Sequence, residues 1–527
     1  MARRAGYEVQ WPLHPPYRSD GGTAWIADLP GELREETDSA ETPRRSRLRL
    51  LEDGRELGPP HALHSMIQDG GDGRYSFWSG VLYFSASDGS DPNRNGRAYT
   101  AVVAEPHLDA RTLRRAIDPA PYEKSWPTPE QPLRVAIIGL GNRGRMVGRL
   151  VTALDGVEIA ALADRSPDRI AEFCQHIAAP SAVVSQEAAE LLALPQVDAV
   201  FVTVPDYLHR EVAEPAFAAG KHVFLEKPLA TTMGDARAIL AAWRASGKVL
   251  QLGYVLRGAP FYRAVRNVVR QGRLGPIRVA ALTDQLEVQH GASYRRRWHG
   301  QSSHSGGLIV HKACHDLDLV CWLLETRPSH VSSFGGVDTF CRPAPADYCS
   351  QCPEAGECLY VDRQLHEQRT PAERADPTAY GLDRCVFRSD IDIVDNQVVS
   401  FELANGVRGT FALAMQGPLR SERRIMLIGD KGRLDGVFED GSFTLTFNEP
   451  EAEPVVWTGG SHGGHGGGDV ASVMAFLNAC LGRARPPIAS PAEALAGLAF
   501  ALAAEASRKS GAIVSLNDDD FRLAGFD

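Results

Sequence analysis

Three basic side chains, His311, Lys312 and His315, follow an apolar run in the stretch GGLIVHKACHDLDL at residues 306–319. A buried ionisable group costs free energy unless another group pairs with it or a reaction uses it. Because His311 and His315 are four residues apart, a helix would place both imidazoles on one face. There they could bind a metal, transfer protons, or only complete a hydrogen-bonded core.

A catalytic zinc is the weaker interpretation of this histidine pair. Such a site needs a third ligand, and the motif H-E-x-x-H adds a glutamate directly after the first histidine as general base. Here Lys312 occupies that position. Proton transfer is therefore the favoured chemistry, and the elements that bring a substrate and a cofactor to these residues must lie elsewhere in the chain.

A glycine-rich turn after residue 138 supplies the second chemical signal. The stretch RVAIIGLGNRGRMVGRLV (134–151) has the pattern of a buried strand, a turn with Gly139, Gly141 and Gly144, and a helix. The helix N-terminus of such a turn binds the pyrophosphate of a dinucleotide. Asp164 ends the next apolar strand, at the spacing where a carboxylate meets the adenosine ribose. It favours NAD, whereas the adjacent Arg165 could neutralise the 2′-phosphate of NADP.

Apolar strands and helical segments continue to alternate up to residue 256. The strands VDAVFVTVP (197–205), KHVFLEKP (221–228) and VLQLGYVLR (249–257) each follow a helical pattern. This alternation predicts a parallel, doubly wound sheet whose ligand crevice lies at the carboxyl ends of the strands. Residues 131–256 are therefore predicted to form a Rossmann-type dinucleotide-binding domain.

Several motifs in order resemble the Gfo/Idh/MocA family of NAD(P)-dependent oxidoreductases. They are GLGNRG, VTVPDYLH, EKP and the H-x-x-D that begins at His315, and the resemblance covers residues 133 to about 515. It implies an α/β fold in which residues 257–527 form an α/β domain with a large, mostly antiparallel open sheet, often used in oligomer contacts. Residues 1–130 lie outside the resemblance. Their short strand-like runs predict a small β-rich accessory module that ends in a proline-rich linker.

The resemblance also implies roles for individual residues. Lys227 of the E-K-P motif and His315 would handle the proton of the substrate hydroxyl. His311 stands where many relatives have aspartate, so it orients the substrate, shares the proton or takes a ligand. A glycine loop with His462 and His465 either lines the pocket or lies on the surface. The expected cofactor-binding residues are Gly139, Gly141, Asn142, Arg143, Gly144, Asp164, Arg165, Pro205, His209, Glu226 and Lys227. The expected substrate contacts are Arg257, Tyr294, Arg297, Lys312 and Asp318.

A cysteine-rich insert, residues 339–385, contains Cys341, Cys349, Cys352 and Cys358 in the spacing C-x7-C-x2-C-x5-C. Without a secretory signal, such clustering favours a metal over disulfides. Four thiolates suffice for tetrahedral structural zinc, although an iron–sulfur cluster uses the same ligands. Zinc is the prediction, with a cluster or no metal as alternatives. The remaining cysteines are scattered, as buried small hydrophobic residues usually are.

Composition limits the partners and the location. The chain has 527 residues, which predicts two or three domains, and 56 basic against 66 acidic residues give a net charge of −10. This charge argues against nucleic acid and anionic lipid as partners. No apolar run is long enough to span a bilayer, and the N-terminus lacks the apolar core of a signal peptide. We therefore expect a soluble, cytoplasmic homo-oligomer that binds a small molecule.

These observations lead to one main functional hypothesis and two alternatives. The main hypothesis is an NAD(P)-dependent oxidoreductase that transfers a hydride between the nicotinamide and a secondary hydroxyl of a sugar, sugar derivative or polyol. The first alternative is a redox-neutral, NAD-dependent glycoside hydrolase that oxidises its substrate only transiently. The second is a noncatalytic sugar-sensing protein, against which the presence of both Lys227 and His315 counts.

Overall fold

The structure of the 527-residue chain is a computed structural model. It divides into two compact units, Met1–Leu113 and Arg114–Asp527. Most of the predicted linker, residues 120–132, lies outside the described residues. Among the residues that the structure describes, no helix is both long and apolar enough to cross a membrane. The described residues are 3–5, 8–29, 37–39, 46, 48–104, 118, 126, 128–361, 381–417, 420–449, 452–459, 464–483 and 488–521.

The first unit is β-rich, as its sequence predicts. A five-stranded sheet has the order β1-β2-β9-β5-β6 and a four-stranded sheet the order β3-β4-β8-β7. Aromatic side chains from both sheets, including Tyr75, Phe84 and Tyr99, fill the core between them. The strands are β1 (Arg3–Ala5), β2 (Glu8–Pro12), β3 (Arg18–Gly21), β4 (Ala24–Ala27), β5 (Leu48–Glu52), β6 (Arg55–Glu56), β7 (Tyr75–Trp78), β8 (Val81–Phe84) and β9 (Tyr99–Ala104), with one helix, α1 (His64–Gly70).

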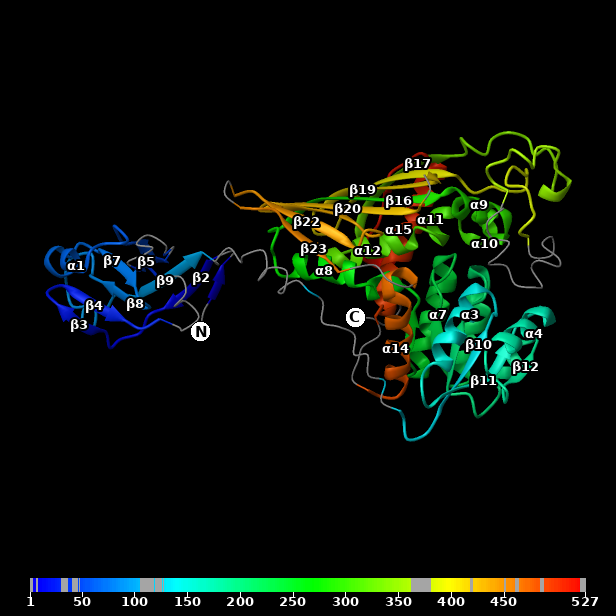
Figure 1. The fold of residues 1–527 in the computed structure, drawn as a ribbon, viewed down its shortest axis with the longest axis horizontal. Helices are drawn as coiled ribbons and strands as arrows, with labels where there is room; N and C mark the ends of the chain where they lie inside the picture. Colours follow the sequence, from blue (N-terminus) through cyan, green and yellow to red (C-terminus); the bar gives the residue numbers. More distant parts are fainter. Residues whose placement is uncertain are drawn as a thin grey trace. The chain divides into compact units, whose positions relative to one another are not determined.

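The second unit begins with the predicted Rossmann-type domain (Figure 1). Its six strands are all parallel in the order β12-β11-β10-β13-β14-β15, so the order reverses between β10 and β13. The strands are β10 (Leu133–Ile138), β11 (Val157–Ala163), β12 (Val183–Ser185), β13 (Ala199–Val202), β14 (His222–Leu225) and β15 (Leu250–Leu252). The helices are α3 (Asn142–Thr152), α4 (Pro167–His176), α5 (Ala188–Leu192), α6 (His209–Ala218) and α7 (Met233–Ser246).

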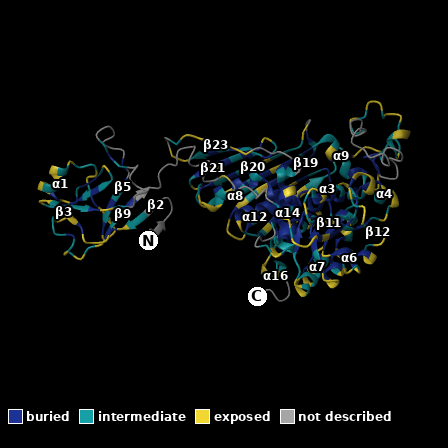
Figure 2. Cartoon of the chain, turned by 60° about the horizontal axis from the view of Figure 1, so that its bottom comes forward, coloured by how far each residue is buried: buried dark blue, intermediate teal, exposed yellow. Residues whose placement is uncertain are grey.

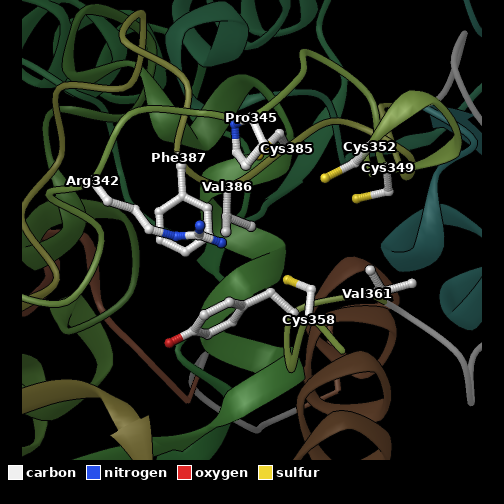
Figure 3. A pocket seen from close by; sticks show the side chains of 10 residues that line it. Arg342, Pro345, Cys349, Cys352, Cys358, Val361, Cys385, Val386 and Phe387 are labelled. Carbon is white, nitrogen blue, oxygen red and sulfur yellow. The ribbon is translucent and has the colours of Figure 1, made fainter. Parts of the chain in front are cut away.

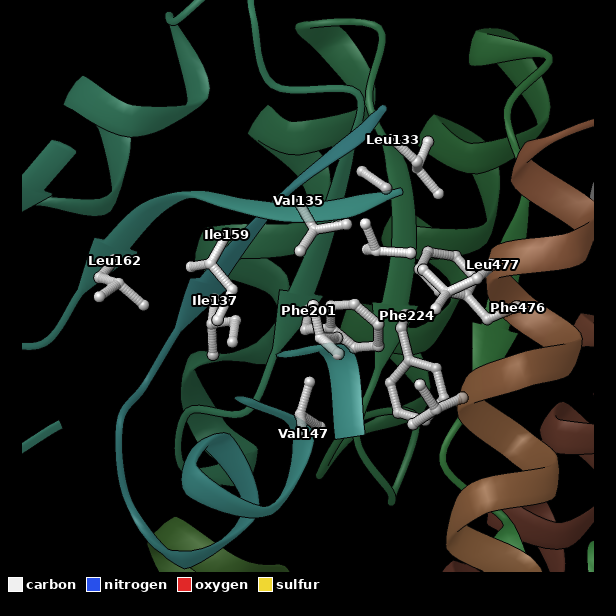
Figure 4. Packing of buried hydrophobic residues seen from close by; sticks show 14 of the residues in the cluster. Leu133, Val135, Ile137, Val147, Ile159, Leu162, Phe201, Phe224, Phe476 and Leu477 are labelled. Atoms are coloured by element: carbon white, nitrogen blue, oxygen red, sulfur yellow. The ribbon is translucent and has the colours of Figure 1, made fainter. Parts of the chain in front are cut away.

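A helix from far along the sequence completes the core of this domain. Phe476 and Leu477 of α14 (Gly468–Cys480) pack with Phe201 and Phe224 of the central strands, as Figure 4 shows. The ring centroids of Phe201 and Phe476 are 5.2 Å apart. The buried apolar runs that form the strands therefore need α14 to exclude water from the sheet.

A nine-stranded mixed sheet forms the second domain, in the order β23-β22-β21-β20-β16-β19-β18-β17-β24. Only the β16–β19 pair is parallel, so the sheet is mostly antiparallel as expected. Helices α8 (Pro260–Arg270), α12 (Cys314–Leu324) and α15 (Pro491–Ser510) lie along one face (Figure 1). The strands are β16 (Ile277–Glu287), β17 (Pro328–Gly336), β18 (Asn396–Leu403), β19 (Arg408–Gly417), β20 (Glu422–Gly429), β21 (Gly432–Val437), β22 (Ser442–Phe447), β23 (Val455–Thr458) and β24 (Val514–Ser515).

Burial follows this layered arrangement. Figure 2 shows buried residues in the interior and exposed residues on the outer turns. Helix α12 is buried along its whole length, because α15 packs against it and both helices lie against the sheet. The polar residues that α12 carries must therefore find partners inside the protein or line a cavity.

Candidate active site

The glycine turn lies at the point where the strand order reverses, which is where ligands bind in open α/β sheets. Gly139 has φ +93°, and a Cβ there would lie 2.7 Å from the carbonyl of Thr203. A Cβ on Gly144 would lie 2.1 Å from the carbonyl oxygen of Gly139. Gly141, by contrast, faces open space and precedes α3, which has no side-chain cap. The turn therefore leaves room and unshared N–H groups for a pyrophosphate.

Asp164 is held at the carboxyl end of β11 by backbone donors. The N–H of Leu140 donates to its Oδ2 at 2.8 Å and the N–H of Ser166 to its Oδ1 at 2.9 Å. The side chain of Arg165 is 75% exposed and lies 3.9 Å from Glu211. Asp164 thus has a fixed carboxylate with lone pairs left for ribose hydroxyls, and these residues fit a bound NAD.

Two of the expected cofactor contacts instead join two parts of the second unit. Arg143 lies between two carboxylates, with Nη2 2.6 Å from Glu226 and Nη1 2.9 Å from Asp469 of α14. Burial opposes the charge of Arg143, but these two carboxylates outweigh it and raise its pKa. Arg143 and Glu226 stay expected cofactor contacts, and the structure adds that they pair with each other. Asn142 is exposed at the start of α3 and accepts a hydrogen bond from Arg145.

The turn after β13 contains the next expected contacts. Pro205 begins the short helix η2 (Asp206–Leu208) at the carboxyl edge of the sheet. His209 is fully buried, and its Nδ1 donates to the carbonyl oxygen of Pro228 at 2.8 Å. Burial also lowers the pKa of His209, so the ring is neutral. His209 therefore supports the loop that carries Lys227, and its expected contact with the cofactor stays a prediction.

Lys227 meets the histidine segment in space. It follows β14, precedes Pro228 through a cis peptide bond, and is half-buried. Its Nζ donates to the carbonyl oxygen of His311 at 2.8 Å. Burial lowers the pKa of both His311 and His315, and the charge of Lys227 lowers both further. The structure thus brings the three expected catalytic residues to one place.

His311 forms a pair with Asp206, a residue that the sequence reasoning missed. Its Nδ1 lies 2.5 Å from Asp206 Oδ2, and both side chains are buried. Burial raises the pKa of Asp206 to about 7 and lowers that of His311, so the pair shares one proton near neutral pH. The available signal was that Asp206 directly follows the end of a predicted parallel strand.

The helix predicted around His311 and His315 is broken between them. α11 (Leu308–His311) ends before Lys312, and α12 starts at Cys314. His315 is buried, and its Nδ1 has no hydrogen-bond partner among the described residues. Its ring lies 5.9 Å from that of His465, whose Nδ1 is 2.9 Å from Asp469. A neutral imidazole with a missing partner fits a base for a substrate hydroxyl. His462 lies outside the described residues.

Lys312 turns away from the pocket into a buried charge network. Its Nζ donates to Asp284 Oδ2 at 2.7 Å. The guanidinium of Arg423 lies 3.2 Å from the same oxygen and 3.3 Å from Asp316. This pairing explains why a buried lysine is tolerated beside His311, and a contact of Lys312 with substrate stays a prediction.

Arg257 and Asp318 are likewise paired with each other. Arg257 donates to Asp318 through Nε at 2.8 Å and Nη2 at 2.6 Å, and their side chains are 0% and 1% exposed. Nη1 also donates to Glu493 at 2.7 Å. Neither residue has surface left for a ligand. In this structure they form a buried link between η3 (Val255–Gly258), α12 and α15, and their expected role as substrate contacts stays a prediction.

Tyr294 and Arg297 are the expected substrate contacts that do lie near the pocket. Tyr294 belongs to α9 (Val288–Arg296), its ring is 5.5 Å from that of His311, and its hydroxyl is 3.2 Å from His290. The charge of Arg297 contributes to the lowered pKa of His299, after burial and His311. Tyr294 and His299, whose ring is 4.5 Å from that of His311, thus form one wall beside the catalytic residues.

The cysteine insert does not show the predicted zinc. Among the described residues, no group of three or more His, Cys, Asp or Glu is arranged to hold a metal. Cys341 is exposed, and its thiol donates to the carbonyl oxygen of Asp338. Cys349, Cys352 and Cys358 instead line a small cavity, together with Cys385 (Figure 3).

Two family models match the second unit in sequence order. Residues 133–254 match the model for the NAD-binding Rossmann fold of the GFO_IDH_MocA oxidoreductase family. Residues 266–516 match the model for the C-terminal alpha/beta domain of the same family. The two matches include the glycine turn, Lys227 and His315.

Individual proteins agree with these models. A putative oxidoreductase, YteT of Bacillus subtilis, is 29% identical over 346 residues, which are 59% of this chain and 80% of that protein. An inositol 2-dehydrogenase of Gluconacetobacter diazotrophicus is 34% identical over 195 residues, 37% of this chain and 55% of its own length. For most such relatives, the match spans about half of the relative.

Solved structures share the fold. A levoglucosan dehydrogenase in complex with NADH and levoglucosan aligns with a TM-score of 0.58 at 18% identity, over 74% of this chain and 100% of that one. A myo-inositol 2-dehydrogenase of Lactobacillus plantarum aligns with a TM-score of 0.55 at 18% identity, over 73% and 100%.

Proposed function

Because the chain belongs to the Gfo/Idh/MocA family of oxidoreductases, we propose that it transfers a hydride between a nicotinamide cofactor and a secondary hydroxyl of a sugar, sugar derivative or polyol. The observation that carries this proposal is the meeting of Lys227, the Asp206–His311 pair and a neutral His315 at the carboxyl edge of the Rossmann sheet. Relatives named as inositol 2-dehydrogenases support the substrate class.

Alcohol oxidation removes a hydride from carbon and a proton from oxygen, so a base must reach the hydroxyl. The bound nicotinamide supplies the hydride acceptor. His315 is the proposed base, because burial keeps its imidazole neutral and its Nδ1 lacks a partner within the described residues. Lys227, fixed by the carbonyl of His311, stabilises the negative charge that develops on the oxygen.

The Asp206–His311 pair supplies a place for the released proton. It lies directly beside Lys227, whose charge lowers the pKa of Asp206 against the raising effect of burial. The pair shares a proton across 2.5 Å and titrates near neutral pH, so it exchanges protons with the pocket at low free-energy cost. Its position explains why a histidine replaces the aspartate of many relatives: here the carboxylate comes from η2 instead.

We propose NAD as the preferred cofactor over NADP. The carboxylate of Asp164 is fixed at the end of β11 by two backbone N–H donors, where it would repel a 2′-phosphate. Arg165 is exposed and lies near Glu211, so its charge is partly offset. A tighter binding of NADP than NAD would contradict this preference.

We also propose that the protein forms a homo-oligomer through the open face of the nine-stranded sheet. Phe334 of β17 and Val398 of β18 are register partners on this face and are 72% and 47% exposed. Val279 of β16 lies on the same face and is 39% exposed. Apolar side chains in one exposed strip are typical of a subunit contact.

Lys227→Ala tests the catalytic proposal. We expect kcat to fall by about 10² to 10⁴-fold, the usual contribution of a proton-handling or charge-stabilising group, while NAD binding by calorimetry is unchanged. Lys509→Ala is the matched control, because Lys509 is exposed and forms an ion pair with Glu505, away from the proposed catalytic residues. Unchanged turnover in Lys227→Ala would refute the proposed role.

A further inference from the structure

Two distant segments of the cysteine insert pair with each other. The N–H of Cys349 donates to the carbonyl oxygen of Asp383 at 2.6 Å, and the N–H of Cys385 donates to that of Asp347 at 2.8 Å. Tyr348 and Arg384 form an antiparallel bridge between these bonds. This pairing places Cys385 beside Cys349, which the linear sequence does not indicate.

A tight turn adds the next two thiols. The N–H of Cys352 donates to the carbonyl oxygen of Cys349 at 3.1 Å, and that of Cys358 donates to Glu354 at 3.1 Å. Cys349, Cys352, Cys358 and Cys385 all line one cavity of about 10 Å³, as measured for the centre of a water-sized sphere. In Figure 3, Cys349 and Cys352 lie side by side, and Cys358 comes from a different segment of the insert. The space is about that of one water molecule or one ion.

The four cysteines gather at one cavity as free thiols. All nine cysteines of the chain are free thiols, so no disulfide explains this gathering. A bound divalent cation would stabilise this arrangement, because the cation favours the thiolate form of each cysteine.

We propose that Cys349, Cys352, Cys358 and Cys385 form a tetrathiolate site for one structural zinc ion. Cys341 is excluded, because it is exposed and does not line the cavity. Among the described residues, no such group is already arranged as metal ligands. Binding of zinc would therefore move the four sulfur atoms to about 2.3 Å from the ion. Each thiol would release its proton on binding.

The site would stabilise a wall of the proposed active site. Gln289 of α9 donates to the carbonyl oxygen of Leu359 at 2.6 Å, next to Cys358. Arg295 of the same helix donates to that of Val386 at 2.9 Å, next to Cys385. Tyr294 lies on the same helix. An ordered insert would therefore hold α9, and with it Tyr294, through these two hydrogen bonds to backbone carbonyls next to the proposed ligands.

The full-length protein, purified under reducing conditions and dialysed after incubation with zinc, tests this site by elemental analysis. We expect about one zinc per chain in the unaltered protein and in Cys341→Ser, and a loss of most of it in Cys385→Ser. Each variant removes one sulfur atom from the same insert, but only Cys385 lines the cavity.

Two further measurements separate metal binding from misfolding. In the unaltered protein, chelation of the zinc should expose four additional thiols to a thiol reagent, and Co²⁺ should give the visible absorption of tetrahedral thiolate coordination. Absence of zinc from the reduced unaltered protein would overturn the proposal. So would loss of zinc in Cys341→Ser but not in Cys385→Ser, or stoichiometric iron and sulfide in its place.

Discussion

The pair of Arg257 and Asp318 gives the sharpest stability prediction. Arg257→Met should lower the free energy of unfolding of the second unit by about 3–5 kcal/mol, because it leaves the Asp318 carboxylate buried without a partner. Asp318 is 1% exposed, and burial already raises its pKa despite the opposing charge of Arg257. Arg257 therefore contributes to stability mainly by compensating the negative charge of Asp318, which is shielded from water.

A surface pair offers a control with the same geometry. Arg278 donates to Asp430 through Nε at 2.8 Å and Nη2 at 2.8 Å, as Arg257 does to Asp318, but the side chains of Arg278 and Asp430 are 63% and 44% exposed. Arg278→Met should therefore change stability by less than about 1 kcal/mol. Burial is the main difference between the two pairs.

Urea unfolding followed by tryptophan fluorescence measures both changes. The double change Arg257→Met with Asp318→Leu should recover most of the loss, since it removes both buried charges. The cost of Arg257→Met should also shrink as the pH falls and Asp318 becomes protonated. An effect below about 1 kcal/mol, equal to that of Arg278→Met, would refute the view that Arg257 is a buried structural residue.

Three further predictions concern the pocket, the cofactor turn and the open sheet. The pKa of Asp206 is raised to about 7, and Asp206 must lose its proton before its pair with His311 can accept another, so oxidation should slow as the pH falls through about 7. Asp206→Asn should abolish this pH dependence of kcat/KM. An unchanged pH profile in the variant would contradict the prediction. Gly141→Ala should leave the melting temperature unchanged but weaken NAD binding about tenfold or more by calorimetry, whereas Gly144→Ala should lower the melting temperature, because only the second Cβ meets backbone. Phe334→Ser should reduce the molar mass measured by light scattering to that of a monomer, and an unchanged mass would exclude this face as the contact.

The sequence predicted the fold of the second unit because its signals are local. Buried parallel strands appear as continuous apolar runs, and the turn at Gly139 and Gly144 needs glycine for backbone reasons that the structure shows directly. Lys227 and His315 were found through motifs of a family, and the structure brings them together. The break in the helix at Lys312 was not predicted, and neither was the ion pair of Lys312 with Asp284 of β16.

Three of the expected site residues have ionic partners that the sequence did not indicate. Arg143, Arg257 and Lys312 are charged residues near ligand-binding motifs, and a sequence does not reveal whether a carboxylate from elsewhere already pairs with each charge. Asp469, for example, reaches Arg143 from α14, at the other end of the chain. Cys385 was not included among the predicted metal ligands for a similar reason. Only the pairing of two segments of the insert brings it beside Cys349.

The most direct test of the account is a panel of polyols, free sugars and glycosides with added NAD, followed by both NADH absorbance and product mass. The account predicts that NADH accumulates with at least one polyol or sugar, that the product is lighter by two hydrogens, and that Lys227→Ala abolishes both signals. Cleavage of a glycoside without net NADH would contradict it and would establish redox-neutral hydrolysis instead.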